Sequence, residues 1–206
     1  MIKVYIYKAF ERFWHWTQAS LIIFLALTGF EVHDSIHIFG FDKAVHFHRV
    51  AAYLLLGLIV IAIFWHFTTG EWRQYIPTFR KLKDQVRYYT VGIFRREPHP
   101  TRKTALSKLN PIQVIVYLGF KIILVPLSVI TGLLYMFYKH IDANNIIVIS
   151  KIKLSTIAVW HTFGAILLIA FLILHVYMTT TGETLTSNIR AMITGYEELE
   201  QADSAN

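Results

Sequence analysis

The segment from Leu154 to Gly182 contains no Asp, Glu, Lys or Arg, yet it carries two histidines, His161 and His175. An apolar run of this length predicts an α-helix that crosses a membrane, because little besides helices and closed barrels satisfies backbone groups in lipid. Fourteen residues along a helix return a side chain to within about 40° of its starting direction, roughly 21 Å further along the axis. Both imidazoles are therefore predicted on one stripe of one helix, one toward each membrane surface, where each needs a partner inside a bundle.

Three further apolar runs have the length of a membrane span, and 55% of the chain is hydrophobic. They run over about 13–30, 50–70 and 111–138, and Lys121 is the one charge inside the last of them. The predicted fold is all-α: a four-helix transmembrane bundle forming a single integral-membrane domain over residues 1–206. The predicted helices cover about 13–32, 46–69, 111–138 and 154–181. The basic start of the chain imitates a signal peptide, but no small-residue cleavage pattern follows, so we expect it to be retained.

Four spans place both termini and the segment between spans two and three on the same side of the membrane. These segments (1–12, 71–108 and 183–206) hold most of the 20 Lys and Arg residues, so both termini are predicted to be cytoplasmic, as in a multi-pass protein of a bacterial inner membrane. The basic and aromatic segment 71–108 is expected to lie as an amphipathic loop on the lipid surface. Topology and anionic lipid explain the net charge of +7 more simply than nucleic-acid binding, and no nucleic-acid partner is expected. The acidic end, around Glu197 and Glu198, is expected to fray.

Four histidines occupy matched depths in the predicted spans. His48 and His161 fall near the outer ends of spans two and four, while His15 and His175 fall toward the cytoplasmic side of spans one and four. An outer pair (His48 with His161) and an inner pair (His15 with His175) would each supply the two axial nitrogens of one haem. Such bis-histidine iron has no open position for oxygen, so these centres are predicted to transfer electrons.

Other readings of the histidines stay open. His66 lies five helical turns after His48, about 27 Å along the same face of the helix. It could replace His15 as the inner haem ligand, contact a haem propionate, or donate a proton to a quinone. His33, His37 and His46 crowd the first outer loop, where a solvated polar surface is the simpler explanation. A zinc site would need three or four ligands at one level, and single membrane histidines are often packing residues.

The chain has no cysteine. This excludes disulfides, haem attached through a Cys-x-x-Cys-His motif, and cysteine-ligated iron–sulfur clusters within this chain. Any such redox centre must belong to a partner protein.

Two similar short motifs lie toward the outer ends of spans one and three. They are Leu27-Thr28-Gly29 and Ile130-Thr131-Gly132. A glycine there would let a helix approach a bulky planar ligand closely, and ordinary small-residue helix packing is the alternative.

Several of these features occur together in one known family. The motifs are Arg12-x-x-His15-Trp16, the Leu-Thr-Gly that ends span one, His48 at the start of span two, Asn110-x-x-Gln113 at the start of span three, and His161-x13-His175 in span four. Together they resemble the prokaryotic di-haem cytochrome b subunits, the cytochrome b561-like membrane anchors of formate dehydrogenase, nickel–iron hydrogenase and thiosulfate reductase complexes. The resemblance covers roughly residues 5 to 195, and the histidine pair of span four is its specific element.

The resemblance implies the same ligand pairs for two haem b groups. It also implies a quinone site beside the cytoplasmic-side haem, near Asn110 and Gln113, with His175 close by. Amide groups suit a quinone carbonyl or hydroxyl, although Asn110 before Pro111 also has the pattern of a helix N-cap. Haem propionates need cations to neutralise them, and the candidates are Arg12 and Lys121 on the inner side and Arg49 on the outer side. The alternative is that these side chains anchor the helices at the membrane interface.

The predicted function is a di-haem cytochrome b that passes electrons between membrane quinone and a periplasmic redox partner carrying iron–sulfur clusters or c-type haems. The chain is then an electron-transfer subunit of an oxidoreductase complex rather than a stand-alone enzyme. Two alternatives from other classes remain: a histidine-rich metal-binding or transport protein, and a haem-free anchoring protein. The direction of electron flow and the choice between His15 and His66 stay open at this point.

Overall fold

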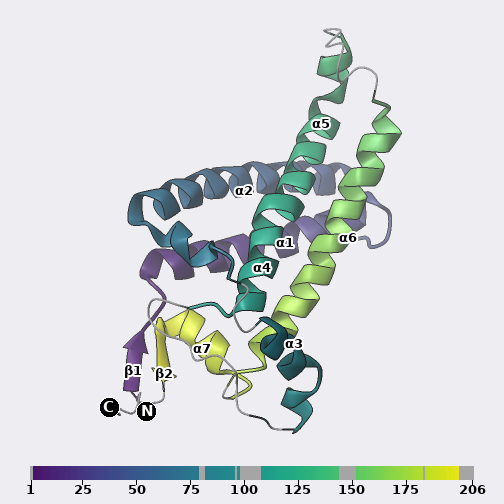
Figure 1. The fold of residues 1–206 in the computed structure, drawn as a ribbon. Helices are drawn as coiled ribbons and strands as arrows, with labels where there is room; N and C mark the ends of the chain where they lie inside the picture. Colours follow the sequence, from purple (N-terminus) through teal and green to yellow (C-terminus); the bar gives the residue numbers. More distant parts are fainter. Residues whose placement is uncertain are drawn as a thin grey trace. The chain divides into compact units, whose positions relative to one another are not determined.

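The computed structural model is mostly helical and describes residues 2–78, 82–95, 97, 108–143, 152–182 and 184–199 (Figure 1). The long helices lie over the four apolar runs. The order of elements is β1 (Ile2–Tyr5), α1 (Ala9–Val32), α2 (Phe41–Thr69), η1 (Glu71–Tyr75), α3 (Leu82–Thr90), η2 (Gly92–Arg95), α4 (Pro111–Gly119), η3 (Phe120–Leu124), α5 (Val125–Ala143), α6 (Leu154–Thr179), α7 (Ser187–Thr194) and β2 (Tyr196–Leu199).

Within the described residues, three helical stretches are long and apolar enough to cross a membrane: Phe41–Thr69, Pro111–Lys139 and Leu154–Thr179. At most 28% of each apolar window is buried inside the protein, as expected for helices whose sides contact lipid. Helix α1 has 24 residues, enough to span, but its first half carries polar side chains such as His15 and Gln18, and it does not reach the same apolarity. The predicted first span is therefore a helix, α1, and its crossing of the membrane is a proposal.

The chain forms two compact units, and each is assembled from separate stretches of sequence. The first unit comprises Met1–Thr17, Val60–Leu118 and Val176–Asn206, and the second comprises Gln18–Ile59 and Gly119–His175. Helices α1, α2 and α6 each contribute residues to both units, so each unit is built from distant parts of the sequence.

The first unit contains a small sheet that the all-helical prediction missed. Strand β1 pairs antiparallel with β2, with Ile2 opposite Leu199 and Tyr5 opposite Tyr196. The Tyr5 and Tyr196 rings lie 5.1 Å apart, and the Lys3 ammonium lies 5.0 Å from the centre of the Tyr196 ring. The expectation that the acidic end frays is thus wrong for Tyr196–Leu199, because strand pairing and cross-strand side-chain contacts order it.

The segment between spans two and three is more structured than a loop. It contains η1, α3 and η2, and Gln85 of α3 is fully buried within the first unit. The Pro98-His99-Pro100 stretch lies outside the described residues.

The third apolar run is one continuous helical path with a π-helical insertion, η3, between α4 and α5. The N–H of Val125 bonds to the carbonyl of Phe120, five residues earlier. Pro126 explains this insertion, because proline has no N–H and its ring clashes with the carbonyl four residues before it. Lys121 lies inside the insertion, so the one charge of this run falls where the helix is irregular.

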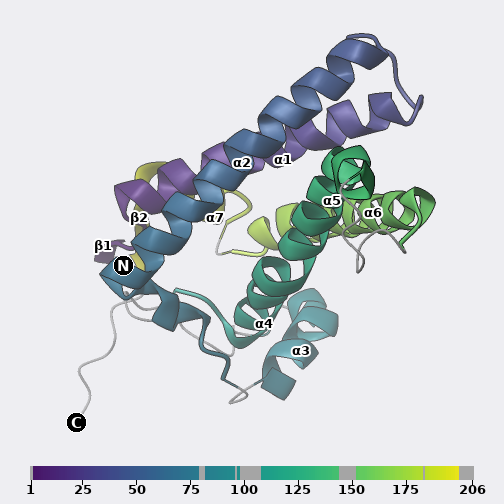
Figure 2. The same cartoon turned by 90° about the horizontal axis from the view of Figure 1, so that it is seen from above.

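The second unit contains two helix pairs. The later part of α1 lies beside the early part of α2 in both views (Figures 1 and 2). The turn between them is held by Glu31, whose Oε1 accepts backbone N–H bonds from Ile38, Phe39 and Gly40 at 2.9, 2.6 and 2.6 Å. Helices α5 and α6 form the other pair and are joined by hydrogen bonds from His161 to α5. This unit therefore brings together the segments that carry His48 and His161.

Candidate haem site

Two of the four predicted ligands lie next to each other in the second unit. The rings of His48, on α2, and His161, on α6, have centroids 6.2 Å apart and planes at 79°. A bond from imidazole to a metal is about 2 Å long, so two nitrogens on opposite sides of one iron lie about 4 Å apart and the ring centroids lie further apart still. The observed separation leaves room for one iron between the rings, and the pair fits one bis-histidine haem.

A threonine and a glycine hold each of these rings. Thr28 Oγ1 lies 2.9 Å from His48 Nδ1, and Thr131 Oγ1 lies 3.1 Å from His161 Nδ1. A Cβ built on Gly29 would lie 3.6 Å from Cε1 of His48, and one built on Gly132 would lie 3.0 Å from Cε1 of His161. Gly132 therefore makes room for the His161 ring, while Gly29 lies beside the His48 ring with space for an ordinary contact; the sequence pattern specified neither.

The two histidines of the predicted inner pair belong to different units. His15, on α1, belongs to the first unit, where its ring lies 5.1 Å from that of Trp16. His175 is the last residue of the second unit, and its ring stacks on Phe171 at 5.7 Å, which in turn stacks on Phe120 at 4.4 Å. The pairing of His15 with His175 stays a prediction.

His66 is enclosed by aromatic rings in the first unit. Its Nδ1 lies 2.7 Å from the carbonyl oxygen of Ala62, and since a carbonyl only accepts, Nδ1 carries the proton of this bond. The rings of Trp14, Trp65 and Tyr75 lie 5.1, 5.2 and 5.7 Å from the imidazole. Its 8% exposure shows a packed histidine, and its three suggested roles as inner ligand, propionate contact or proton donor stay predictions.

The residues Asn110 and Gln113 cap the start of α4. Asn110 Oδ1 accepts the N–H of Gln113 at 2.8 Å, and Gln113 Oε1 accepts the N–H of Asn110 at 3.0 Å. Pro111 at the first helical position completes the pattern, so the N-cap interpretation is confirmed. The Asn110 amide also donates to the hydroxyl of Tyr89 at 3.0 Å. Each amide oxygen accepts one backbone N–H, and the Gln113 amide N–H₂ takes no part in these capping bonds.

The three candidate propionate contacts differ in setting. Arg12 donates from Nη1 to the carbonyl of Ile193 at 2.7 Å, and its Nε is buried without a hydrogen-bond partner among the described residues. A buried guanidinium N–H without a partner is unusual in a folded protein and fits an anionic group that the protein chain does not supply. Arg49 is exposed, and Lys121 is half-buried in η3.

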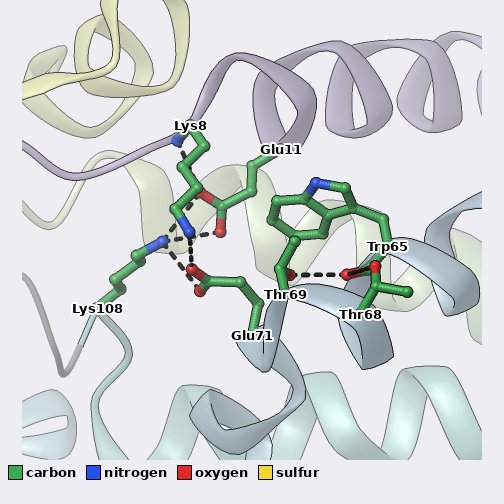
Figure 3. A network of polar contacts seen from close by, with 7 residues as sticks. All are labelled: Lys8, Glu11, Trp65, Thr68, Thr69, Glu71 and Lys108. Carbon is green, nitrogen blue, oxygen red and sulfur yellow. Dashed lines mark hydrogen bonds and ion pairs between the residues drawn. The ribbon is translucent and has the colours of Figure 1, made fainter.

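A buried ion network in the first unit was missed by the sequence analysis (Figure 3). Lys108 Nζ lies 2.9 Å from both carboxylate oxygens of Glu11 and 3.4 Å from Glu71 Oε2. Lys8 Nζ lies 2.6 Å from Glu71 Oε1, while the Lys8 backbone N–H donates to Glu11 at 2.7 Å. The network ties the start of α1, the turn after α2 and the segment before α4 together. Beside it, the hydroxyls of Thr68 and Thr69 donate to the Trp65 carbonyl in the last turns of α2.

The Glu71 carboxylate gives the network a dependence on pH. Burial alone would raise the pKa of Glu71, but the ammonium groups of Lys8 and Lys108 outweigh it and hold the pKa below its usual 4.5. Because the folded pKa is the lower one, the stabilisation is present above pH 4.5 and is lost as the pH falls through the folded pKa. We expect the free energy of unfolding to fall with acidification below that pH. In Glu71→Gln, the free energy of unfolding should change less steeply with pH. A denaturant titration at several pH values measures it, and an equal slope in the variant would contradict the assignment.

Comparison with known proteins places this chain among membrane cytochromes. Residues 6–195 match the model of the prokaryotic cytochrome b561 family. The putative cytochrome YdhU of Escherichia coli is 28% identical over 94% of this chain and 74% of its own length. Two proteins named probable Ni/Fe-hydrogenase B-type cytochrome subunits, from Bradyrhizobium diazoefficiens and Rhizobium leguminosarum, are 26% and 24% identical over 93% of this chain and over 85% and 87% of their own lengths. No solved structure matches significantly.

Proposed function

The chain belongs to the prokaryotic cytochrome b561 family, and from that premise we propose that it is a membrane electron-transfer subunit holding two haem b groups. It passes electrons between membrane quinone on the cytoplasmic side and a redox subunit on the periplasmic side. The observation that carries the proposal is the His48–His161 pair, whose ring separation of 6.2 Å suits one iron.

The two haems would be held by two histidine pairs. His48 and His161 hold the outer haem, and His15 and His175 hold the inner haem, with His66 as the alternative to His15. Held between two histidines, each haem would supply one-electron transfer without binding oxygen, and the task of this chain would be to supply both imidazoles. Arg12 supports the inner haem as a propionate contact, since its Nε is buried and without a partner among the described residues. Lys121 and Arg49 are the further propionate contacts.

The proposed topology has four spans with both termini in the cytoplasm. Three of these spans are the apolar helices over Phe41–Thr69, Pro111–Lys139 and Leu154–Thr179, and α1 is the fourth. The distribution of Lys and Arg supports this orientation in a bacterial inner membrane.

The proposed partner is a catalytic or electron-carrying subunit with its own redox centres. The chain has no cysteine for iron–sulfur clusters or for covalently attached haem. The names of two relatives place those proteins in Ni/Fe-hydrogenases. A hydrogenase, molybdoenzyme or multihaem subunit is therefore the class of partner for this chain.

The quinone is proposed to bind near the start of α4, where the Gln113 amide N–H₂ donates to a quinone oxygen. Asn110 shapes this site mainly as the cap of α4, and His66 is the candidate proton donor. The capping bonds support a rigid placement of Gln113, since its side-chain oxygen is already fixed on the Asn110 N–H.

The variant Gln113→Glu tests the quinone site without removing the helix cap. A carboxylate still accepts the Asn110 N–H, but it has no N–H to donate to a quinone oxygen. We expect the rate of haem reduction by a water-soluble quinol, followed optically in the purified holoprotein, to fall about tenfold or more, which is about 1.4 kcal/mol of lost interaction. Haem content and thermal stability should stay unchanged. A wild-type rate in Gln113→Glu would remove Gln113 from the quinone site.

A further inference from the structure

The two helix pairs of the second unit repeat one local arrangement. In each pair, a Thr-Gly motif on the first helix contacts a histidine on the second. Thr28 and Gly29 of α1 contact His48 of α2, while Thr131 and Gly132 of α5 contact His161 of α6. The same chemistry therefore occurs twice, once on each proposed ligand of the outer haem.

The hydroxyl of Thr28 fixes which nitrogen of His48 carries the proton. Thr28 Oγ1 lies 2.9 Å from the carbonyl of Phe24 and 3.2 Å from that of Leu25. A hydroxyl has one proton and carbonyls only accept, so this proton points to the backbone of α1. The Thr28 oxygen then accepts the proton of His48 Nδ1, 2.9 Å away. In a neutral imidazole this leaves the lone pair on Nε2.

The same logic applies to His161, with one further acceptor. Thr131 Oγ1 lies 2.6 Å from the carbonyl of Leu127, to which it donates, and 3.1 Å from His161 Nδ1. The carbonyl of Ser128 lies 3.2 Å from the same Nδ1 and accepts as well. Both acceptors require a proton on Nδ1, so the lone pair again falls on Nε2.

We propose that Thr28 and Thr131 are positioning residues that hold His48 and His161 in the Nδ1–H tautomer and aim their Nε2 lone pairs at the outer haem iron. The inference rests on the proposed function, because it assigns these histidines to a haem. An acceptor on Nδ1–H makes an imidazole a stronger electron donor through Nε2, as carboxylates and carbonyls do for other metal-bound histidines. Stronger donation favours ferric iron, so the two hydroxyls lower the reduction potential of the outer haem.

The glycine that follows each threonine also lies against the histidine ring. A Cβ at position 132 would press on His161 at 3.0 Å, whereas one at position 29 would make ordinary contact with His48 at 3.6 Å. At His161, Thr131 supplies the hydrogen-bond partner of the ring, and Gly132 leaves the space that the ring occupies.

The test replaces each hydroxyl by a methyl of similar size, in Thr28→Val and Thr131→Val. Thr28→Ser and Thr131→Ser keep the hydroxyl and should restore wild-type behaviour. Thr68→Val is the matched control, because Thr68 Oγ1 bonds to the carbonyls of Phe64 and Trp65 at the same 2.9 and 3.2 Å, and no histidine is among its hydrogen-bond partners in the described residues.

Two measurements are needed on these variants. In the holoprotein, redox titration followed optically should show one midpoint potential shifted to a more positive value in each Val variant, and none shifted in Thr68→Val. In haem-free protein labelled with ¹⁵N, histidine ring shifts should show His48 and His161 as Nδ1–H tautomers, with mixed tautomers in the Val variants. Unchanged potentials and tautomers in both Val variants would overturn the inference. A wild-type protein unable to bind haem would instead overturn the proposed function, while the ring shifts would still decide the tautomer.

Discussion

Replacing His161 by alanine is expected to reduce the haem content of the purified chain from two haem b groups to one. His161 faces His48 at 6.2 Å between ring centroids, and alanine leaves the outer iron with one axial nitrogen. An iron held on one side is bound weakly in a membrane bundle and is open to external ligands. Haem per polypeptide, measured by the pyridine haemochrome method, should fall by half, and His48→Ala should give the same result.

His46→Ala is the matched control for His48→Ala. His46 lies on the same helix two residues earlier and is exposed, so the two side chains leave α2 in different directions. His46→Ala should retain both haems with an unchanged spectrum. Two haems with a wild-type spectrum in His161→Ala would show that this histidine is a packing residue.

Replacing Lys108 by methionine is expected to destabilise the protein more than any other change in the ion network. Lys108 is 5% exposed and lies 2.9 Å from both oxygens of Glu11 and 3.4 Å from Glu71. Methionine keeps the length of the side chain but leaves the buried carboxylate of Glu11 and the half-buried carboxylate of Glu71 beside a single remaining lysine. Removing one partner of a buried ion pair costs about 3–5 kcal/mol, because the remaining charge stays without compensation. For a chain of this size, that cost lowers the melting temperature by about 10 °C.

Lys8→Met is the control that distinguishes the effect of losing a buried lysine from the effect of losing an exposed one. The Lys8 side chain is 50% exposed although it lies 2.6 Å from Glu71, so solvent screens its interaction. Exposed pairs contribute about 0–1 kcal/mol, and the melting temperature should fall by a few degrees at most. Thermal melts of both variants in the same detergent measure the difference. Equal decreases of the melting temperature in Lys8→Met and Lys108→Met would show that the burial of Lys108 adds nothing to its contribution to stability.

Membership of the cytochrome b561 family was predictable from the sequence. The pattern of four histidines, two Thr-Gly motifs and the Asn-x-x-Gln motif indicated it, and the match over residues 6–195 confirms it. The mostly helical fold with membrane-length helices followed from the apolar runs, since a run of that length in lipid permits few other structures. The predicted four-helix bundle with two haems goes further and remains a proposal.

Features that depend on contacts between distant residues were not predictable. The sheet joins residues near the two ends of the chain, and neither strand has a strong alternating pattern. The ion network joins Glu11, Glu71 and Lys108, which are separated in sequence by tens of residues and look individually like ordinary interfacial charges. The Thr-Gly motifs were visible in the sequence, but only the structure shows that each glycine packs on a histidine ring.

The central claim is that this chain holds two haem b groups between histidine pairs. A dithionite-reduced-minus-oxidised spectrum of the purified wild-type protein, with haem quantified per polypeptide, tests this claim directly. Two low-spin b-type haems per chain are predicted. One haem per chain would contradict the claim at one of the two pairs, which His15→Ala, His66→Ala and His161→Ala would then identify. Folded protein that contains no haem after expression with an adequate haem supply would contradict the account as a whole.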